Sequence, residues 1–497
     1  MRNYCEGIIT ERRIPHVEPH KWIPRCFTYE IFRIRESMSC KGLQEMKLVC
    51  FLTFMIVLAT SSFAKLEEYK LSANQSSILL NLYHVHGDAS SLEPNSSSSF
   101  CDILSRDEEH VKFLSSRLRK KDVQGASFSR HKSGHLLEPN SANIPLNPGL
   151  SIGSGNYYLK LGLGSPPKYY TMILDTGSSL SWLQCKPCVV YCHSQVDPLF
   201  EPSASNTYRP LYCSSSECSL LKAATLNDPL CTASGVCVYT ASYGDASYSM
   251  GYLSRDLLTL TPSQTLPSFT YGCGQDNEGL FGKAAGIVGL ARDKLSMLAQ
   301  LSPKYGYAFS YCLPTSTSSG GGFLSIGKIS PSSYKFTPMI RNSQNPSLYF
   351  LRLAAITVAG RPVGVAAAGY QVPTIIDSGT VVTRLPISIY AALREAFVKI
   401  MSRRYEQAPA YSILDTCFKG SLKSMSGAPE IRMIFQGGAD LSLRAPNILI
   451  EADKGIACLA FASSNQIAII GNHQQQTYNI AYDVSASKIG FAPGGCR

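Results

Sequence analysis

The sequence carries the same short motif in each of its halves. Residues 172–182 lead from an apolar run into Asp175-Thr176-Gly177-Ser178, and residues 373–382 lead from another apolar run into Asp377-Ser378-Gly379-Thr380. The apolar runs favour β-strands, and a glycine between hydroxyl side chains favours a tight turn after each strand. A repeat of this kind predicts a chain folded as two similar halves, with the two aspartates meeting where the halves join.

A second repeated feature follows each motif. Asp175 is followed later by Gly286-Ile287-Val288-Gly289, and Asp377 by Ala468-Ile469-Ile470-Gly471. The first interval also holds residues 185–237, a segment rich in Cys, Pro and Ser that we expect to be an excursion from the core. Short alternating runs with many Gly, Ser, Thr and Tyr favour a mostly β fold, and the best helical pattern of the second half covers residues 388–403.

Two aspartates held close together have a specific chemistry. Like charges at short distance cannot both ionise cheaply, so such a pair shares one proton and titrates as a unit. One carboxylate then acts as a general base on a water molecule, while the other carboxyl donates a proton to a carbonyl oxygen. Asp175 and Asp377 are therefore the candidate catalytic residues, and this reaction requires no metal, cofactor or covalent intermediate.

The residues that follow the aspartates fit this use. They are hydroxyl residues and glycines: Thr176, Gly177, Ser178, Ser378, Gly379 and Thr380. The hydroxyls of Ser178 and Thr380 are expected to hydrogen-bond the outer carboxylate oxygens, and those of Thr176 and Ser378 to join the two loops. The glycines allow backbone N–H groups to approach the carboxylates.

Charge and histidine content argue against other chemistries. The formal net charge is +11, but no dense basic tract carries the excess in the second part of the chain, so we expect no nucleic-acid partner. Only His193 and His473 follow residue 142. Two histidines are too few for a histidine-rich metal site and offer few candidates for a Ser-His-Asp triad.

The cysteines form two groups. Five of the 17 precede residue 150, and the other twelve are Cys185, Cys188, Cys192, Cys213, Cys218, Cys231, Cys237, Cys273, Cys312, Cys417, Cys458 and Cys496. An even set of twelve suits six disulfides and an oxidising compartment. A zinc site at the first three of them is the alternative interpretation, and a thioredoxin-like redox role is a weaker one.

The N-terminal region carries a targeting signal. Residues 1–45 are an extension of doubtful status, whereas residues 46–64 have the basic start, apolar core and small-residue end of a secretory signal peptide. The apolar core is too short for a membrane span. Its position indicates that translation starts at Met38 or Met46. A chloroplast transit peptide fits less well, because residues 1–45 contain acidic residues and little serine.

Residues 65–143 are expected to form a prosegment. Apolar residues recur at helical spacing over residues 102–121, and both glycosylation sequons, at Asn74 and Asn95, lie in this region. The prosegment would fill the cleft between the halves. Its basic stretch, residues 117–121, is a candidate to neutralise the aspartates until acid weakens the contact.

At this point the sequence resembles a known family. The features shared with that family are the two aspartate motifs, Tyr243-Gly244-Asp245, Trp182, Gly471-Asn472 with Gln474-Gln475-Gln476, and the cysteine-rich segment. They are similar to the pepsin-like (A1 family) aspartic endopeptidases, and more closely to the plant nepenthesin-type branch, over roughly residues 150–497. The resemblance implies a mostly β, bilobal fold with the active-site cleft between two β-rich lobes, at residues 144–335 and 336–497.

The resemblance also implies roles for single residues. Tyr243 is expected to be a flap residue that closes over the substrate, with Trp182 holding its ring. Ala246 stands where the family usually has glycine, which would alter the flap tip and hence substrate preference or rate. The implied disulfides are Cys185–Cys188, Cys192–Cys273, Cys213–Cys237, Cys218–Cys231, Cys312–Cys496 and Cys417–Cys458.

The expected function is that of a secreted aspartic endopeptidase that is made as a zymogen and cleaves polypeptide substrates without a cofactor. The mature form is expected to be a monomer and to have no membrane span. The expected location is the extracellular space (apoplast), with the vacuole or chloroplast as alternatives. Two other functions stay open: a non-catalytic binding or inhibitor protein with the protease fold, and a plastid nucleoid-associated protease that binds DNA.

Overall fold

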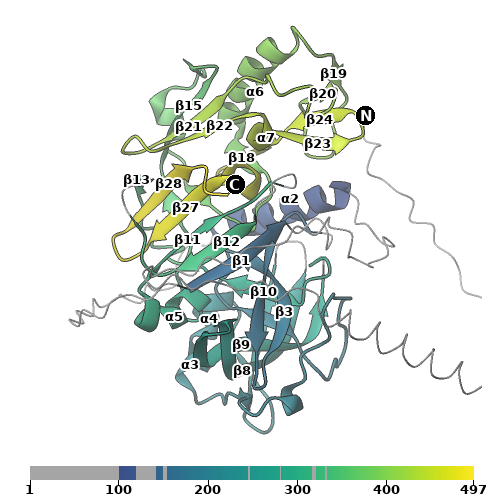
Figure 1. Ribbon diagram of the computed structural model, residues 1–497, viewed down its shortest axis with the longest axis vertical. Coiled ribbons are helices and arrows are strands. Elements are labelled where there is room, and N and C mark those ends of the chain that lie inside the picture. The colour runs from purple at the N-terminus through teal and green to yellow at the C-terminus, as the bar shows by residue number, and fades with distance from the viewer. Residues whose placement is uncertain are drawn as a thin grey trace, which may run out of the picture. The chain divides into compact units, whose positions relative to one another are not determined.

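The computed structural model describes residues 100–118, 142–148, 154–243, 247–279, 281–315, 321–330 and 333–496 (Figure 1). The extension, the signal peptide, the sequons and Gly244–Ala246 lie outside these residues. Within them, no helix is both long and apolar enough to cross a membrane.

One sheet of fifteen strands runs through the first half of the chain and takes in its C-terminal end. Figure 1 shows β27 and β28 lying beside β11, so the last strands of the chain complete a sheet begun by the first. Its strands are β1 (Ala142–Pro148), β2 (Tyr157–Leu163), β3 (Lys168–Asp175), β4 (Trp182–Gln184), β5 (Arg209–Pro210), β6 (Leu230–Cys231), β7 (Cys237–Ser242), β8 (Tyr248–Thr261), β9 (Gln264–Glu278), β10 (Gly286–Gly289), β11 (Ala308–Cys312), β12 (Gly322–Ile326), β13 (Lys335–Pro338), β27 (Tyr478–Asp483) and β28 (Lys488–Pro493).

Three smaller sheets build the second half. The five-stranded sheet contains β14 (Phe350–Leu351), β17 (Thr374–Ile376), β18 (Thr383–Pro386), β25 (Phe461–Ser464) and β26 (Ala468–Ile470). One four-stranded sheet contains β15 (Leu353–Val358), β16 (Arg361–Pro362), β21 (Ile431–Phe435) and β22 (Asp440–Leu443). The other contains β19 (Gln407–Ala408), β20 (Cys417–Lys419), β23 (Leu449–Asp453) and β24 (Ile456–Leu459). The chain therefore has two β-rich lobes.

The helices are few and mostly short. They are α2 (Phe100–Arg117), α3 (Ser216–Ser219), α4 (Leu221–Thr225), α5 (Met297–Tyr305), α6 (Ile387–Met401), α7 (Ala445–Ile448) and α8 (Asn472–Gln475), with 3-10 turns at Pro202–Ala204 and Ala367–Tyr370. The two helices predicted from the sequence, at residues 102–121 and 388–403, correspond to α2 and α6. Helix α2 is amphipathic and buries Ile103, Leu104, Val111 and Leu114, as its apolar spacing indicated.

The sequence repeat is also a repeat of strand pairing. Strand β3 runs parallel to β10, with Asp175 opposite Gly289, and β17 runs parallel to β26, with Ile376 opposite Ile470. A short strand then returns antiparallel to each: β4 beside β10 and β18 beside β26. Each aspartate therefore sits at the end of a buried strand, held by the apolar-apolar-glycine strand that the sequence repeats.

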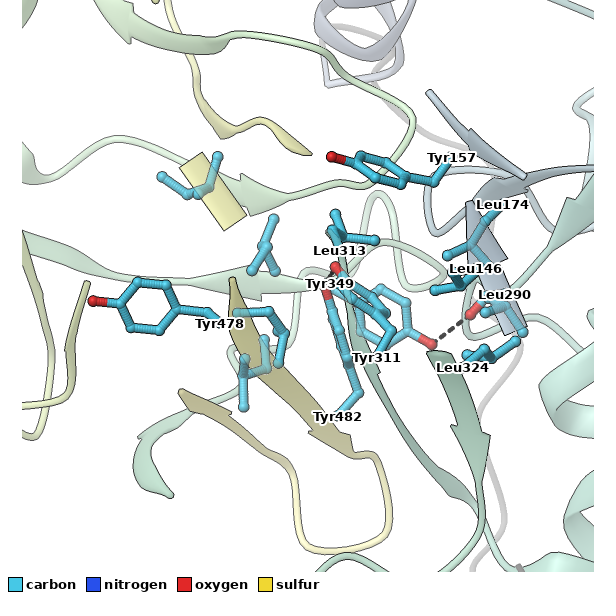
Figure 2. Close-up of a cluster of buried hydrophobic side chains, with 14 of the residues drawn as sticks. Leu146, Tyr157, Leu174, Leu290, Tyr311, Leu313, Leu324, Tyr349, Tyr478 and Tyr482 are labelled. Carbon is cyan, nitrogen blue, oxygen red and sulfur yellow. Dashed lines mark hydrogen bonds between the residues drawn. The ribbon is translucent and has the colours of Figure 1, made fainter. Parts of the chain in front are cut away.

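A cluster of tyrosines fills the core where the two lobes meet. The rings of Tyr349 and Tyr482 lie 4.6 Å apart, and that of Phe309 stacks on Tyr482 at 4.4 Å. The hydroxyls of Tyr311 and Tyr482 are 2.8 Å apart (Figure 2). Buried hydroxyls need partners, so the cluster carries hydrogen bonds as well as apolar area.

Two of these hydroxyls support the aspartate loops. Tyr349 donates to the carbonyl oxygen of Leu290 at 2.6 Å, the dashed contact in Figure 2, and the N–H of Leu290 donates to the carbonyl oxygen of Asp175 at 2.9 Å. Tyr311 donates to the side-chain oxygen of Gln475, whose amide donates to the carbonyl oxygen of the second aspartate at 3.2 Å. The core therefore fixes the backbone of both loops.

The twelve cysteines form six disulfides, which overturns the zinc interpretation, but four of the implied pairings are wrong. Cys312–Cys496 and Cys417–Cys458 are as implied. The other four disulfides are Cys185–Cys273, Cys188–Cys192, Cys213–Cys231 and Cys218–Cys237.

Strand pairing explains the corrected connectivity. Strand β4 runs beside β9 with Leu183 opposite Cys273, which brings the Cα of Cys185 to 5.4 Å from that of Cys273, a distance that suits a disulfide. Cys188 and Cys192 then close a small loop. The other four cysteines pair with each other, Cys231 and Cys237 being neighbours on β6 and β7, so their spacing in the sequence could not distinguish the three possible pairings.

We predict that Tyr349→Phe lowers the free energy of unfolding by about 1–3 kcal/mol, because it leaves a buried carbonyl without its donor. Tyr191→Phe is the control, since Tyr191 is 50% exposed, and it should change the value by less than about 0.5 kcal/mol. Urea unfolding followed by fluorescence measures both. Equal unfolding midpoints for the two variants would contradict a stabilising role for the Tyr349 hydroxyl.

Candidate active site

Two loops from opposite halves of the chain are joined by reciprocal hydrogen bonds. The backbone N–H of Thr176 donates to the hydroxyl of Ser378 at 3.1 Å, and the backbone N–H of Ser378 donates to the hydroxyl of Thr176 at 2.9 Å. The hydroxyl of Ser378 in turn donates to the carbonyl oxygen of Leu174 at 3.2 Å. All three residues are buried, so these bonds are protected from water and hold the loops in a fixed relation.

The two carboxyl groups lie next to each other at this junction. The Thr176 hydroxyl, on the first loop, donates to Oδ1 of Asp377 at 3.2 Å. Gly177 N–H donates to Oδ1 of Asp175 at 2.8 Å, and Ser178 hydrogen-bonds its Oδ2. On the second loop, the N–H of Gly379 and the hydroxyl of Thr380 donate to Asp377 at 3.2 and 2.8 Å. The structure thus contains each hydrogen bond expected of the six neighbouring residues.

Glycine is required at position 379 because the Asp175 carboxyl group comes very close to its Cα. A Cβ added at Gly379 would lie 2.4 Å from Oδ1 of Asp175, closer than such atoms come in proteins. Any side chain there would push the two carboxyl groups apart. The close approach of the two carboxyl groups therefore requires glycine at position 379.

Tyr243 and Trp182 lie beside the junction and contact each other. The indole N–H of Trp182 donates to the Tyr243 hydroxyl at 2.7 Å. Phe281 packs edge-on against both rings, at 4.9 Å from Trp182 and 5.6 Å from Tyr243. Trp182 is fully buried, so it fixes the direction of the more exposed tyrosine. The sequence offered no signal for Phe281.

Helix α2 lies directly on the two aspartates. Nε2 of His110 is 3.0 Å from Oδ2 of Asp377. At the end of the helix, Arg117 donates to the carbonyl oxygen of Gly177 at 3.2 Å and to the hydroxyl of Ser347 at 2.9 Å. A cavity of about 80 Å³ remains beside the helix, lined by His110, Asp175, Tyr243 and Phe281 among others.

The apolar face of α2 packs against the second lobe on both sides of the junction. Ile103 and Leu104 join a buried cluster with Val381 and Val382. Val111 and Leu114 join another with residues that include Leu348, Phe350 and Ile375. Burial of four large side chains stabilises docking by several kcal/mol, at roughly 1.5–3 kcal/mol for each.

A buried ion pair anchors the first half of α2. The carboxylate of Asp107 accepts hydrogen bonds from the backbone N–H groups of Val381 and Val382. It also pairs with Arg384 at 2.9 Å, and both side chains are fully buried. Glu108, on the same helix, lies 3.3 Å from Arg384. The loop that carries Asp377 therefore binds α2 through a carboxylate.

The surroundings of the two aspartates differ. Burial, together with the neighbouring charge of Asp377, raises the pKa of Asp175 to about 6. Burial also raises the pKa of Asp377, but the hydrogen bond and charge of His110 outweigh it and leave the pKa below the usual value. Burial lowers the pKa of His110, but the hydrogen bond and charge of Asp377 dominate and raise it to about 9.

These shifts define the pH range of the His110–Asp377 ion pair. Because the docked pKa of His110 lies above 6.5, its contribution to docking is complete below about pH 6.5 and is lost as the pH rises through about 9. Because the pKa of Asp377 is lowered, its contribution is present above pH 3.8 and is lost as the pH falls through the lowered value. The pair is strongest between these limits.

The three groups at the junction could also be considered as metal ligands. One atom each of His110, Asp175 and Asp377 lies within 4.8 Å of the others, and in the described part of the chain this is the group that could hold a metal ion. Two of these atoms already hydrogen-bond each other. A histidine with a raised pKa is protonated at neutral pH and therefore unavailable to a metal. The geometry favours an ion pair.

Comparison with known proteins identifies the family. Two protein-family models match, described as "Xylanase inhibitor N-terminal" over residues 157–328 and "Xylanase inhibitor C-terminal" over residues 348–493. An aspartyl protease family protein of Arabidopsis thaliana is 40% identical over 447 residues, covering 88% of this chain and 91% of that protein. The chain belongs to the pepsin-like aspartic protease family. Another relative in the family is nepenthesin-2, an aspartic proteinase of Nepenthes gracilis that is 36% identical over 357 residues, 69% of this chain and 78% of that protein.

Solved structures of the same fold confirm the bilobal, mostly β architecture of this aspartic protease family member. Basic 7S globulin from soybean has a TM-score of 0.57 at 20% identity, covering 71% of this chain and 96% of that chain. Conglutin gamma from lupine seeds has a TM-score of 0.57 at 23% identity, covering 71% and 95%. These likenesses concern the fold alone.

The structure brings together the two aspartates, their six neighbours and the Trp182–Tyr243 pair. Sequence reasoning missed Phe281, His110, Asp107 and Arg384. A signal existed for Arg384, since it stands at the same distance after Asp377 as Trp182 does after Asp175. His110 lies within the helix predicted over residues 102–121, but the residues predicted to neutralise the aspartates were the basic stretch 117–121. Of these, Arg117 contacts the first loop and residues 119–121 lie outside the described residues.

We predict that His110 titrates near pH 9 in the intact chain, and that Asp377→Asn lowers its pKa, because the variant loses the hydrogen bond and the charge that oppose burial most strongly, while the charges of Asp175 and Asp107 remain. NMR of the chain with labelled histidines measures the pKa. His473, whose pKa burial lowers to about 4, is the internal control and should not move. An unchanged His110 transition in the variant would contradict the ion pair.

Proposed function

We propose that the chain is a secreted aspartic endopeptidase, made as a zymogen, that cleaves peptide bonds with water activated between Asp175 and Asp377. The observation that carries the proposal is the pair of buried carboxyl groups held side by side by the Thr176–Ser378 hydrogen bonds. Membership of the aspartic protease family supports it.

The proposed reaction needs only the two carboxyl groups and one water molecule. With α2 removed, the pair shares one proton. The ionised carboxylate takes a proton from water as the water oxygen attacks the peptide carbonyl carbon, while the other carboxyl donates its proton to the carbonyl oxygen. The C–N bond then breaks as a proton passes to the amine nitrogen. The loop N–H groups and hydroxyls hold the carboxyl groups in place throughout.

The substrate would lie where α2 lies now. Tyr243 and Phe281 form an aromatic wall of the cavity beside Asp175, with the buried Trp182 in contact with both, and Tyr243 is the candidate flap residue. An extended peptide in this place would contact the aromatic wall on one side and the loop after Asp377 on the other. In the intact chain the helix excludes it, which supports the prosegment as an intramolecular inhibitor, with His110 as the residue that neutralises the dyad.

Secretion is supported by two features. Residues 46–64 carry the signal-peptide pattern, although they lie outside the described residues, and six disulfides suit an oxidising compartment. The extracellular space is the proposed destination, with the vacuole as the alternative.

A second candidate is a non-catalytic protein that binds another protein. The matching family models are described as xylanase inhibitor domains, which favours this alternative. The intact pair of aspartates with all their hydrogen bonds favours hydrolysis. A processed chain that inhibits a xylanase and cleaves no peptide would support the second candidate.

We predict that Asp175→Asn and Asp377→Asn each lower peptide hydrolysis by the processed protein by at least about a thousandfold, because either change removes a proton carrier. Asp228→Asn is the control, since this aspartate is 73% exposed and should leave hydrolysis unchanged. Casein or peptide cleavage, with pepstatin as the inhibitor, provides the measurement. Full activity in either dyad variant would rule out the proposed mechanism.

We predict that the double variant Asp107→Asn, His110→Gln raises peptide cleavage by the unprocessed chain at least about tenfold, because it removes two of the buried charge pairs that dock α2, Asp107–Arg384 and His110–Asp377. Glu109→Gln on the same helix is the matched control, since Glu109 is partly exposed and pairs with Lys112. N-terminal sequencing shows that no cut has occurred during the assay. Equal cleavage by the double variant and the control would contradict inhibition by α2.

A further inference from the structure

Arg384 and Trp182 occupy equivalent places in the two lobes. Trp182 on β4 lies opposite Ile287 of the apolar-apolar-glycine strand β10. Arg384 on β18 lies opposite Ile469 of the corresponding strand β26. The first lobe therefore presents an aromatic side chain beside its aspartate, where the second lobe presents a cation.

Around Arg384 the structure contains a built carboxylate site. The Asp107 carboxylate accepts from two consecutive backbone N–H groups, those of Val381 and Val382, and from Nη2 of Arg384. Charge-assisted hydrogen bonds of this kind are the strong ones. Three donors that converge on one carboxylate, four to seven residues after Asp377, form a pocket with a defined chemical preference.

The pocket loses its anions when α2 leaves. Both carboxylates that pair with Arg384 in the described residues, Asp107 and Glu108, belong to α2. Nε and Nη1 of Arg384 are buried and, within those residues, have no hydrogen-bond partner. A guanidinium in such a position is costly unless an anion compensates it. Removal of the helix therefore leaves a cation whose Nη2, which pairs with both carboxylates of α2, has lost its anions.

We infer that this pocket is a specificity subsite of the processed enzyme, and that it takes the carboxylate side chain of an Asp or Glu residue in the polypeptide substrate. The inference rests on the proposed endopeptidase function and names a preference of the same cleft. In the intact chain, Asp107 occupies the subsite as an acidic substrate residue would.

The subsite lies close to the bond that is cut. Asp107 precedes His110 by three residues on α2, so their side chains are neighbours on one face, with Cβ atoms roughly 5–6 Å apart. His110 contacts Asp377, where the water would be activated. An extended substrate advances about 3.3 Å per residue, which places the acidic side chain within about two residues of the scissile bond.

The pocket should reject the isosteric amides. An Asn or Gln side chain would offer one acceptor oxygen, but its NH₂ group would face the N–H donors of the pocket. A buried donor would then be left unpaired. Sites built for one hydrogen-bonding pattern discriminate strongly against an analogue that breaks it. We therefore expect at least about a tenfold higher kcat/KM for the acidic peptide, the effect of one charge-assisted hydrogen bond.

The test uses the full chain, expressed intact and then processed, and a set of peptides that differ only by Asp/Asn or Glu/Gln at each position near the scissile bond. The wild-type enzyme should prefer the acid at one position. Arg384→Met should reduce the acid-to-amide ratio at that position to about one, and Arg384→Glu should favour a Lys-containing peptide there. Arg394→Met, a partly exposed arginine on α6, is the matched control and should keep the wild-type ratio.

If an Arg384 variant fails to fold, the ratio of cleavage rates for acid and amide peptides in the wild-type enzyme decides the inference. Pepstatin-sensitive cleavage with equal rates for acid and amide peptides at every position would overturn the subsite while leaving the proposed function standing. A preference that survives in Arg384→Met would assign it to other residues and also overturn the inference. No cleavage of any peptide would instead count against the proposed function.

Discussion

The reciprocal hydrogen bonds between Thr176 and Ser378 are the constraint on which the site depends. They join two loops from opposite halves of the chain and set the separation of the two carboxyl groups. Everything around them limits movement: the tyrosine cluster fixes the loop backbones, and the N–H of Gly379 holds one carboxylate. Like charges would otherwise drive the carboxyl groups apart, so the surrounding donors compensate the cost of keeping them together.

Helix α2 uses the same features that a substrate would use. Its histidine supplies the positive charge that the paired aspartates lack, its apolar residues cover the walls, and its aspartate fills the cationic pocket on the second lobe. The charges of α2 are therefore complementary to those of the surface it covers, since the helix presents a cation to Asp377 and an anion to Arg384. Docking by charge and apolar burial together explains why the contacts extend well beyond the dyad.

The sequence was most informative where it repeats. The two motifs predicted the loops, their hydrogen bonds and the lobes, because a short loop with alternating hydroxyls and glycine has few ways to surround a carboxylate. The cysteine pairing failed, because strand register rather than spacing decides which of several close cysteines meet. His110 and Arg384 were missed since their roles exist only when distant segments pack together: one helix residue and one strand residue carry no local sign of their partners.

The central claim is that α2 and a peptide ligand bind at the same place over the two aspartates. The most direct test is the affinity of pepstatin for the chain before and after α2 is cut away, measured by calorimetry at one pH. If α2 covers the paired aspartates, the intact chain should bind the inhibitor at least about a hundredfold more weakly, since only the fraction with an open cleft can bind. The same dissociation constant in both forms would show that the helix does not occupy the site.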